Sequence, residues 1–119
     1  MNIMSTRWIP IQISMIDVEM LGLKEAFLIS ILISKLVTPQ GSYKIDGHWT
    51  AMTYDEWSYN SSMSLSSVKR NLKKLIDKKI IQSKKYNKSD FVHPNWYTIN
   101  QPLLDAMRKD FIKAKKRGV

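Results

Sequence analysis

The stretch that most constrains the fold of this chain runs from Ser64 to Lys79, with the sequence SLSSVKRNLKKLIDKK. Its apolar residues recur at the spacing of one helical face: Val68, Leu72, Leu75 and Ile76. Its basic residues lie off that face: Lys69, Arg70, Lys73 and Lys74. The pattern predicts an amphipathic helix whose apolar side packs on the rest of the chain and whose outer side is cationic.

The start of this helix suits a phosphate group. We expect Ser64 to be the N-cap, because a serine hydroxyl accepts a hydrogen bond from the free amides of the first turn. Ser66 and Ser67 are small and polar, and they lie where unpaired N–H groups and the helix dipole favour an anion. Two interpretations fit this stretch: a recognition helix that enters a groove of a nucleic acid, or a lysine-rich helix that is merely solvated.

The residues before this helix favour the first interpretation. Thr53 and Glu56 have the spacing of a capping box, which predicts a short helix that ends at Asn60. A polar turn over residues 60–63 then leads into Ser64. A short helix, a four-residue turn and a longer basic helix have the organisation of a helix-turn-helix.

Two β-hairpins are predicted around these helices. Residues 80–86 and 96–100 are predicted to be strands joined through a turn at residues 87–90, which makes a wing after the recognition helix. Residues 42–51 form a hairpin or an extended loop around the turn signal Asp46-Gly47. If the recognition helix ends near Lys78, we expect Lys79 to reverse the chain in the left-handed conformation, which strains a residue that has a Cβ.

The remaining segments complete an α+β, mostly helical chain. Residues 23–37 are apolar nearly all round a helix, which predicts a central helix. Residues 1–13 are extended in character, and residues 14–20 predict a short helical turn. Pro102 suits the first turn of a C-terminal helix, and we expect the basic tail 113–119 to fray. We expect residues 1–119 to be a single domain.

The net charge of +9 is concentrated in the second half of the chain. Residues 1–60 carry four basic and six acidic side chains, whereas residues 61–119 carry fifteen basic and four acidic ones. The usual partner of one strongly positive face is a polyanion, nucleic acid first and an anionic membrane second.

The chain contains no cysteine, signal-peptide pattern or apolar run long enough to span a bilayer, so we expect a cytoplasmic protein that binds no membrane.

Four stretches of the sequence resemble the winged-helix domains at the N-termini of phage and plasmid replication proteins. They are LGLKEAFLISILISKL, IDGHWTAMTYDEWSYN, SLSSVKRNLKKLIDKKII and YNKSDFVHPNWYTIN. The family consists of replisome organisers and initiators of the DnaD-like kind, and the resemblance covers roughly residues 9–104. It implies a winged helix-turn-helix fold and a role in replicating a mobile element. Such proteins commonly carry a further C-terminal region that engages a helicase loader or primase. This sequence departs from them because it stops after one predicted helix, so we expect a stand-alone accessory protein whose partner lies in another chain.

The residues expected to contact DNA come from the predicted helix and wing. On the helix they are Ser64, Ser66, Ser67, Lys69, Arg70, Lys73 and Lys74, and on the wing Lys84, Lys85, Tyr86 and Lys88. Arg70 is the best candidate for base readout, because a guanidinium can bridge guanine O6 and N7. The lysines would hold the backbone without reading sequence. The wing suits either a duplex or unpaired bases stacked on its aromatic residues, so single-stranded and double-stranded DNA both remain open.

An enzyme is not expected. His48 and His93 are the only histidines, and no set of residues at metal-ligand spacing accompanies them. No P-loop, dinucleotide-binding turn or nucleophile elbow occurs, so no cofactor is expected. We expect a non-enzymatic DNA-binding accessory protein that acts with a polymerase, primase or helicase. The alternatives are a winged-helix transcription regulator and a protein–protein adaptor with weak DNA binding of its own.

Overall fold

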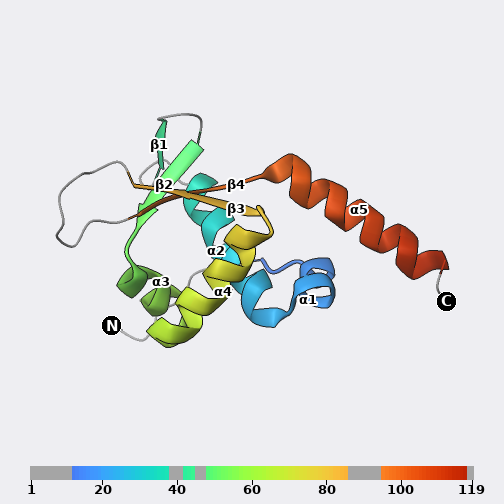
Figure 1. Ribbon diagram of the computed structural model, residues 1–119, viewed down its shortest axis with the longest axis horizontal. Coiled ribbons are helices and arrows are strands. Elements are labelled where there is room, and N and C mark those ends of the chain that lie inside the picture. The colour runs from blue at the N-terminus through green and yellow to red at the C-terminus, as the bar shows by residue number, and fades with distance from the viewer. Residues whose placement is uncertain (1–11, 38–41, 45–47, 86–94, 118–119) are drawn as a thin grey trace, which may run out of the picture.

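The computed structural model describes residues 12–37, 42–44, 48–85 and 95–117 (Figure 1). Within these residues the chain forms five helices: α1 (Met15–Leu21), α2 (Leu23–Val37), α3 (Tyr54–Ser61), α4 (Leu65–Asp77) and α5 (Gln101–Arg117). Four strands accompany them: β1 (Ser42–Lys44), β2 (His48–Met52), β3 (Ile81–Lys84) and β4 (Asn95–Ile99). The predicted α+β class with mostly helical content is confirmed.

Helix α2 lies at the centre of the core, as its composition predicts. Five of its apolar residues are buried: Ala26, Leu28, Ile29, Ile31 and Leu32. They pack with buried side chains from every other helix except α1 and from three strands. The polar Ser30 is accommodated there because its Oγ donates to the Ala26 carbonyl oxygen at 2.9 Å, a bond that serines inside helices often make.

The four strands form one antiparallel sheet in the order β1-β2-β4-β3. The sequence predicted a hairpin after α4 and a hairpin or extended loop over residues 42–51. The structure pairs β1 with β2 and β3 with β4, and it joins the two pairs through β2 and β4. Tyr97 of β4 lies opposite Thr50 on one side and Ser83 on the other. Its buried ring meets the edge of Trp57 from α3 with ring centroids 5.3 Å apart. This contact fixes α3 against the middle of the sheet.

Helix boundaries follow local sequence signals. Ser14 caps α1, with the Asp17 amide donating to its Oγ at 3.2 Å. Gly22 separates α1 from α2 at a φ of 111°, a conformation that residues with a Cβ rarely adopt. Pro102 lies in the first turn of α5, which the Asn100 side chain caps by accepting from the Leu103 amide. Helix α5 continues to Arg117, so the structure has helix where the sequence predicted fraying from Lys113.

Several predicted features fall outside the described residues. They are most of the extended N-terminal segment and the turns at residues 46–47 and 87–90. Among the described helices, none is long and apolar enough to cross a membrane.

Candidate nucleic-acid interface

The turn between α3 and α4 is held by side-chain hydrogen bonds. The predicted capping box begins α3: the Glu56 amide donates to Thr53 Oγ1 at 3.0 Å, and the Thr53 amide donates to Glu56 Oε1 at 2.9 Å. At the other end of α3, Ser62 takes left-handed geometry, with a φ of 59°. The Met63 amide then donates to Ser61 Oγ at 3.2 Å. These contacts fix the direction in which α4 leaves α3.

The inner face of α4 has the predicted phase. Ser64 is the N-cap, because its Oγ accepts from the Ser67 amide at 3.2 Å. Val68, Leu72 and Leu75 are buried. Ile76 is only partly buried at the edge of this face.

The burial of Ser67 corrects one of the predicted DNA contacts. Its side chain is 7% exposed, and its Oγ accepts from Asn71 Nδ2 at 3.2 Å. Asn71 is buried as well and donates to the Ser67 carbonyl oxygen at 2.8 Å. The face of α4 that packs on the core is therefore wider than its apolar stripe, and the Ser67 hydroxyl faces the protein. Ser64 and Ser66 remain exposed at the start of the helix.

The four basic residues of α4 are all exposed, but their surroundings differ. Lys69 Nζ lies 5.1 Å from the ring centroid of Tyr54. Lys73 Nζ pairs with Asp77 Oδ2 at 3.2 Å, and this exposed pair is weak enough to exchange its carboxylate for a phosphate. Lys74 Nζ lies 3.8 Å from Glu25 Oε2 and so extends toward α2.

Arg70 is the least restrained of these cations. It is exposed, and among the described residues it has neither an ion pair nor a hydrogen-bond partner. Its five donor N–H positions are therefore available for an external acceptor.

A groove separates the basic side of α4 from the sheet. Lys69 and Lys73 line one wall, and Ser83 and Tyr97 line the other. Burial raises the pKa of Tyr97 above its ordinary value, so its phenol stays neutral at physiological pH. The α4 side of the groove thus carries two lysines together with Asp77, the partner of Lys73, and the sheet side carries no charged residue among those that line it.

The basic residues of β3 continue the positive surface. Lys84 is exposed, and its Nζ lies 4.7 Å from the ring centroid of the buried Trp49 on β2. Lys85 is exposed immediately after the strand. Tyr86 and Lys88, which the sequence also predicted as contacts, lie outside the described residues.

The junction between α4 and β3 confirms the left-handed residue that the sequence predicts. Lys79 has a φ of 66°. Its amide donates to the Ile76 carbonyl oxygen at 2.9 Å, and the Ile80 amide donates to the Leu75 carbonyl oxygen at 3.0 Å. This is the paired hydrogen bonding of a Schellman motif, with the buried Ile80 and Leu75 as its apolar contact. The motif fixes how β3 leaves α4.

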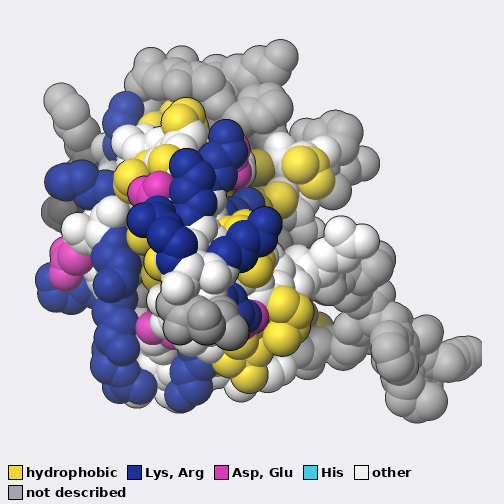
Figure 2. Space-filling model, turned by 90° about the vertical axis from the view of Figure 1, so that its right-hand side faces the viewer, with side chains coloured by type: hydrophobic (Ala, Val, Ile, Leu, Met, Phe, Trp, Pro, Cys, Tyr) yellow, Lys and Arg dark blue, Asp and Glu magenta, His cyan; other side chains and the backbone are white. Residues whose placement is uncertain are grey.

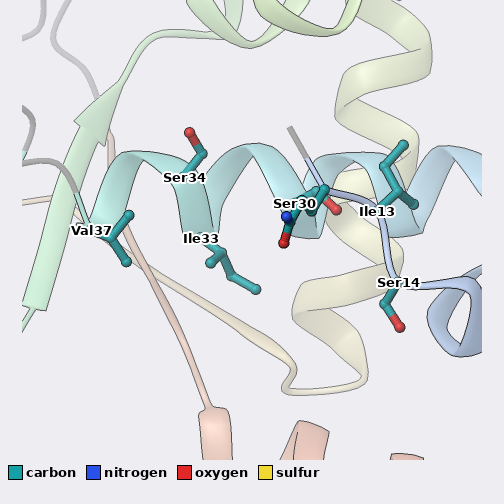
Figure 3. A pocket seen from close by; sticks show the side chains of 7 residues that line it. Ile13, Ser14, Ser30, Ile33, Ser34 and Val37 are labelled. Atoms are coloured by element: carbon teal, nitrogen blue, oxygen red, sulfur yellow. The ribbon is translucent and has the colours of Figure 1, made fainter. Parts of the chain in front are cut away.

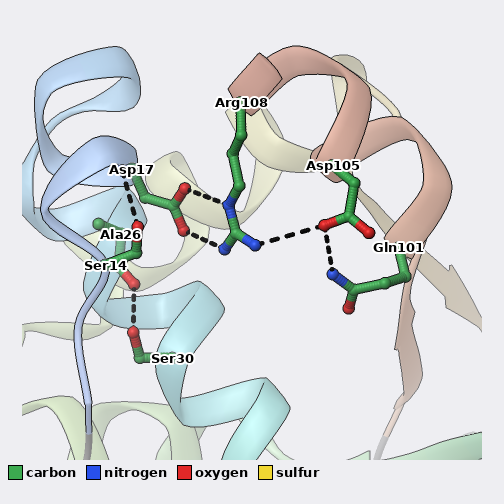
Figure 4. Close-up of polar contacts among 7 residues, drawn as sticks. All are labelled: Ser14, Asp17, Ala26, Ser30, Gln101, Asp105 and Arg108. Carbon is green, nitrogen blue, oxygen red and sulfur yellow. Dashed lines mark hydrogen bonds and ion pairs between the residues drawn. The ribbon is translucent and has the colours of Figure 1, made fainter. Parts of the chain in front are cut away.

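Helices α1 and α5 are joined by ion pairs, of which Figure 4 shows the one between Asp17 and Arg108. Arg108 donates from Nε and Nη2 to the two oxygens of Asp17, at 2.8 and 2.7 Å. The hydrogen bond to Asp17 raises the pKa of the Arg108 guanidinium further, so the guanidinium stays charged. Lys115 pairs with Glu19, two residues after Asp17 on α1.

A second hollow lies along α2 (Figure 3). The described residues that line it carry hydroxyl and amide groups but no charged side chain: Gln12, Ile13, Ser14, Ser30, Ile33, Ser34 and Val37. Within the described part of the chain, no three histidine or acidic side chains come together as a metal site would require. His93 lies outside the described residues.

Comparison of the chain with family models, curated proteins and solved structures found no match.

Proposed function

We propose that this chain is a winged helix-turn-helix protein that binds DNA as a non-enzymatic accessory in the replication of a phage, plasmid or other mobile element. The observation that carries the DNA-binding part is the exposed basic side of α4, which follows a short capped helix and a fixed turn. The pair β3–β4 follows α4 in the order that a wing requires. The replication role rests on the resemblance of the sequence to replication proteins.

In this proposal α4 is the recognition helix. Arg70 reads a base edge, because it is exposed and has no acceptor of its own among the described residues. Lys69 and Lys73 contact phosphates on either side and set the register without reading sequence. Ser64 and Ser66 offer hydroxyls to a phosphate at the start of the helix, where the dipole favours an anion.

The wing residues Lys84 and Lys85 contact an adjacent stretch of backbone. Tyr86 and Lys88 belong to the same proposed contact by their place in the sequence. Lys74 contributes charge at the margin of the interface, because it extends toward Glu25 on α2. Ser67 is left out, since it is buried.

The experiment is a fluorescence-anisotropy titration of a 24-base-pair duplex and a 24-nucleotide single strand with the wild-type chain. The variant that replaces Lys69, Arg70 and Lys73 by alanine should lose most of its affinity and keep its melting temperature, because exposed substitutions change stability by under about 0.5 kcal/mol each. As a matched control, Lys24→Ala removes one exposed positive charge from α2 and should bind nearly as tightly as wild type. Unchanged affinity in the triple variant would show that α4 is not the recognition helix.

The two alternatives predict different behaviour in the same titration. A transcription regulator would prefer duplexes with a repeated half-site, because regulators of this fold usually bind palindromes as dimers. An adaptor would bind both DNAs weakly and would gain affinity only with its polymerase, primase or helicase present. Tight binding that is indifferent to sequence would favour the replication role.

A further inference from the structure

Helix α5 is a long element that has little of its surface in the core. Its 17 residues span about 25 Å. Leu104 is its one fully buried residue among those described, and Figure 1 shows its C-terminal half extending away from the sheet and α4. Met107 packs against the core, and Arg108 and Lys115 form ion pairs with residues of α1.

The ion pairs orient this helix. Asp17 is 1% exposed and is satisfied by both guanidinium hydrogen bonds from Arg108. Asp105 on α5 approaches the same guanidinium at 3.5 Å, and Lys115 pairs with Glu19 two turns further along. Contacts at residues 108 and 115 hold α5 against α1 at two levels. These contacts determine which side of α5 faces away from α1. Helix α5 is called the arm below.

The outer side of α5 carries a stripe of lysines. Lys109, Lys113 and Lys116 recur at i, i+4 and i+7, and all three are exposed. None of them has an ion pair or hydrogen bond within the described residues, although α5 also carries Asp105 and Asp110. Figure 2 shows the molecule from the side toward which the C-terminal end of α5 points. Lys and Arg side chains gather near the middle of this view and along its left margin.

We infer that this stripe, Lys109, Lys113 and Lys116, is a second DNA-binding surface that holds the phosphate backbone outside the segment bound by α4. The inference rests on the proposed function and extends it. From Lys109 to Lys116 the helix rises about 10 Å, and B-DNA carries one phosphate of each strand per about 3.4 Å of its helix axis, so several phosphates fall within the reach of the stripe. Lysines without aromatic neighbours suit backbone contact rather than base readout or stacking.

An anionic membrane is the less suitable partner. A helix that lies on a membrane needs large apolar side chains on the side that inserts. Among the described residues of α5, the large apolar side chains are buried or partly buried except that of Ile112, beside the stripe, which is exposed at 37%. A nucleic-acid backbone requires charge without insertion, which is what the stripe offers.

The test compares three proteins on a 24-base-pair duplex by fluorescence anisotropy over a salt series. They are the wild type, the α4 variant described above, and a variant with Lys109, Lys113 and Lys116 replaced by alanine. The arm variant should bind about tenfold or more weakly near 0.1 M salt. Its slope of log K against log salt should be shallower by up to about 2.7, or 0.9 for each lost contact. The matched comparison is between two variants that each lose one positive charge, Lys113→Ala and Lys24→Ala. Only Lys113→Ala should lower the affinity for the duplex.

The outcomes separate this inference from the proposed function. If the α4 variant loses binding and the arm variant binds with wild-type affinity and slope, the arm is not a DNA surface and only the further inference fails. If the wild type binds no DNA, both fail. If the arm variant loses binding to vesicles of phosphatidylserine and phosphatidylcholine but not to the duplex, the partner is a membrane and the inference is overturned. Circular dichroism melting should show that all variants remain folded.

Discussion

Removing either partner of the Asp17–Arg108 pair should destabilise the chain, but by unequal amounts. In Arg108→Met the Asp17 carboxylate, 1% exposed, is left without its guanidinium partner. In Asp17→Asn the guanidinium that remains is 24% exposed and can turn toward water, and the new amide oxygen still accepts one hydrogen bond. The two variants remove the same contact and differ in which charge is left behind.

The burial of each partner sets the expected magnitudes. Leaving a buried charge unpaired costs about 3–5 kcal/mol, and this range applies to Arg108→Met because Asp17 has almost no access to solvent. The loss of a hydrogen bond to a charged group costs about 1.5–3 kcal/mol, which is the range we expect for Asp17→Asn. Arg108→Met should therefore be the more destabilised variant by roughly 1.5–2 kcal/mol, the difference between the lower ends and between the upper ends of the two ranges.

The assay is urea denaturation at pH 7, followed by circular dichroism, with the free energy of unfolding taken from the midpoint and slope. Lys115→Met is the control, because it removes a cation from the same side of α5 whose partner Glu19 is 40% exposed, and it should cost under about 1 kcal/mol. Equal destabilisation of the two main variants, or a larger effect in Asp17→Asn, would refute the argument from burial.

Three further predictions concern the core and the junctions. Leu72→Ala should lower the free energy of unfolding by about 2–5 kcal/mol, because the side chain is buried, and a wild-type denaturation midpoint would contradict that burial. Lys79→Gly should raise the melting temperature slightly and the free energy of unfolding by at most about 1 kcal/mol. The strain that glycine removes at the left-handed φ should exceed the stability lost because glycine makes the unfolded chain more flexible. A clear loss of stability would mean that Lys79 is unstrained. Burial raises the pKa of Tyr97 in the folded state. The neutral Tyr97 phenol therefore contributes stability below about pH 10, the pKa in the unfolded chain, and this contribution is lost as pH rises through the raised pKa of the folded state. The free energy of unfolding should thus fall less between pH 9 and 11 in Tyr97→Phe than in wild type, and identical pH profiles would show that Tyr97 does not titrate in this way.

Features set by neighbours in the sequence were predictable. The phase of α4 follows from Val68, Leu72 and Leu75, and the capping box from Thr53 and Glu56. The left-handed Lys79 follows from where the helix has to end. Each of these depends on contacts between residues fewer than ten positions apart, so the local pattern carries the information.

Features set by distant pairing were not predictable. The bond between Asp17 and Arg108 joins residues 91 positions apart, and neither position differs locally from an ordinary solvent-exposed charge. The union of the two hairpins depends on the pairing of β2 with β4, which no turn signal specifies. The burial of Ser67 arises because α4 packs over an arc wider than its apolar stripe. The pair Ser67 and Asn71, four apart beside that stripe, is the signal that could have indicated it.

The central claim, that α4 binds DNA through its basic side, is tested most directly by a nuclear magnetic resonance titration of the ¹⁵N-labelled chain with a 24-base-pair duplex. Backbone amide signals from Ser64 to Lys74 should shift or broaden most, those of Lys84 and Lys85 should follow, and the changes should diminish as salt is raised. Signals of the central helix α2 should move little. The account is contradicted if the duplex binds and leaves the α4 signals in place, or if no signal changes at low salt.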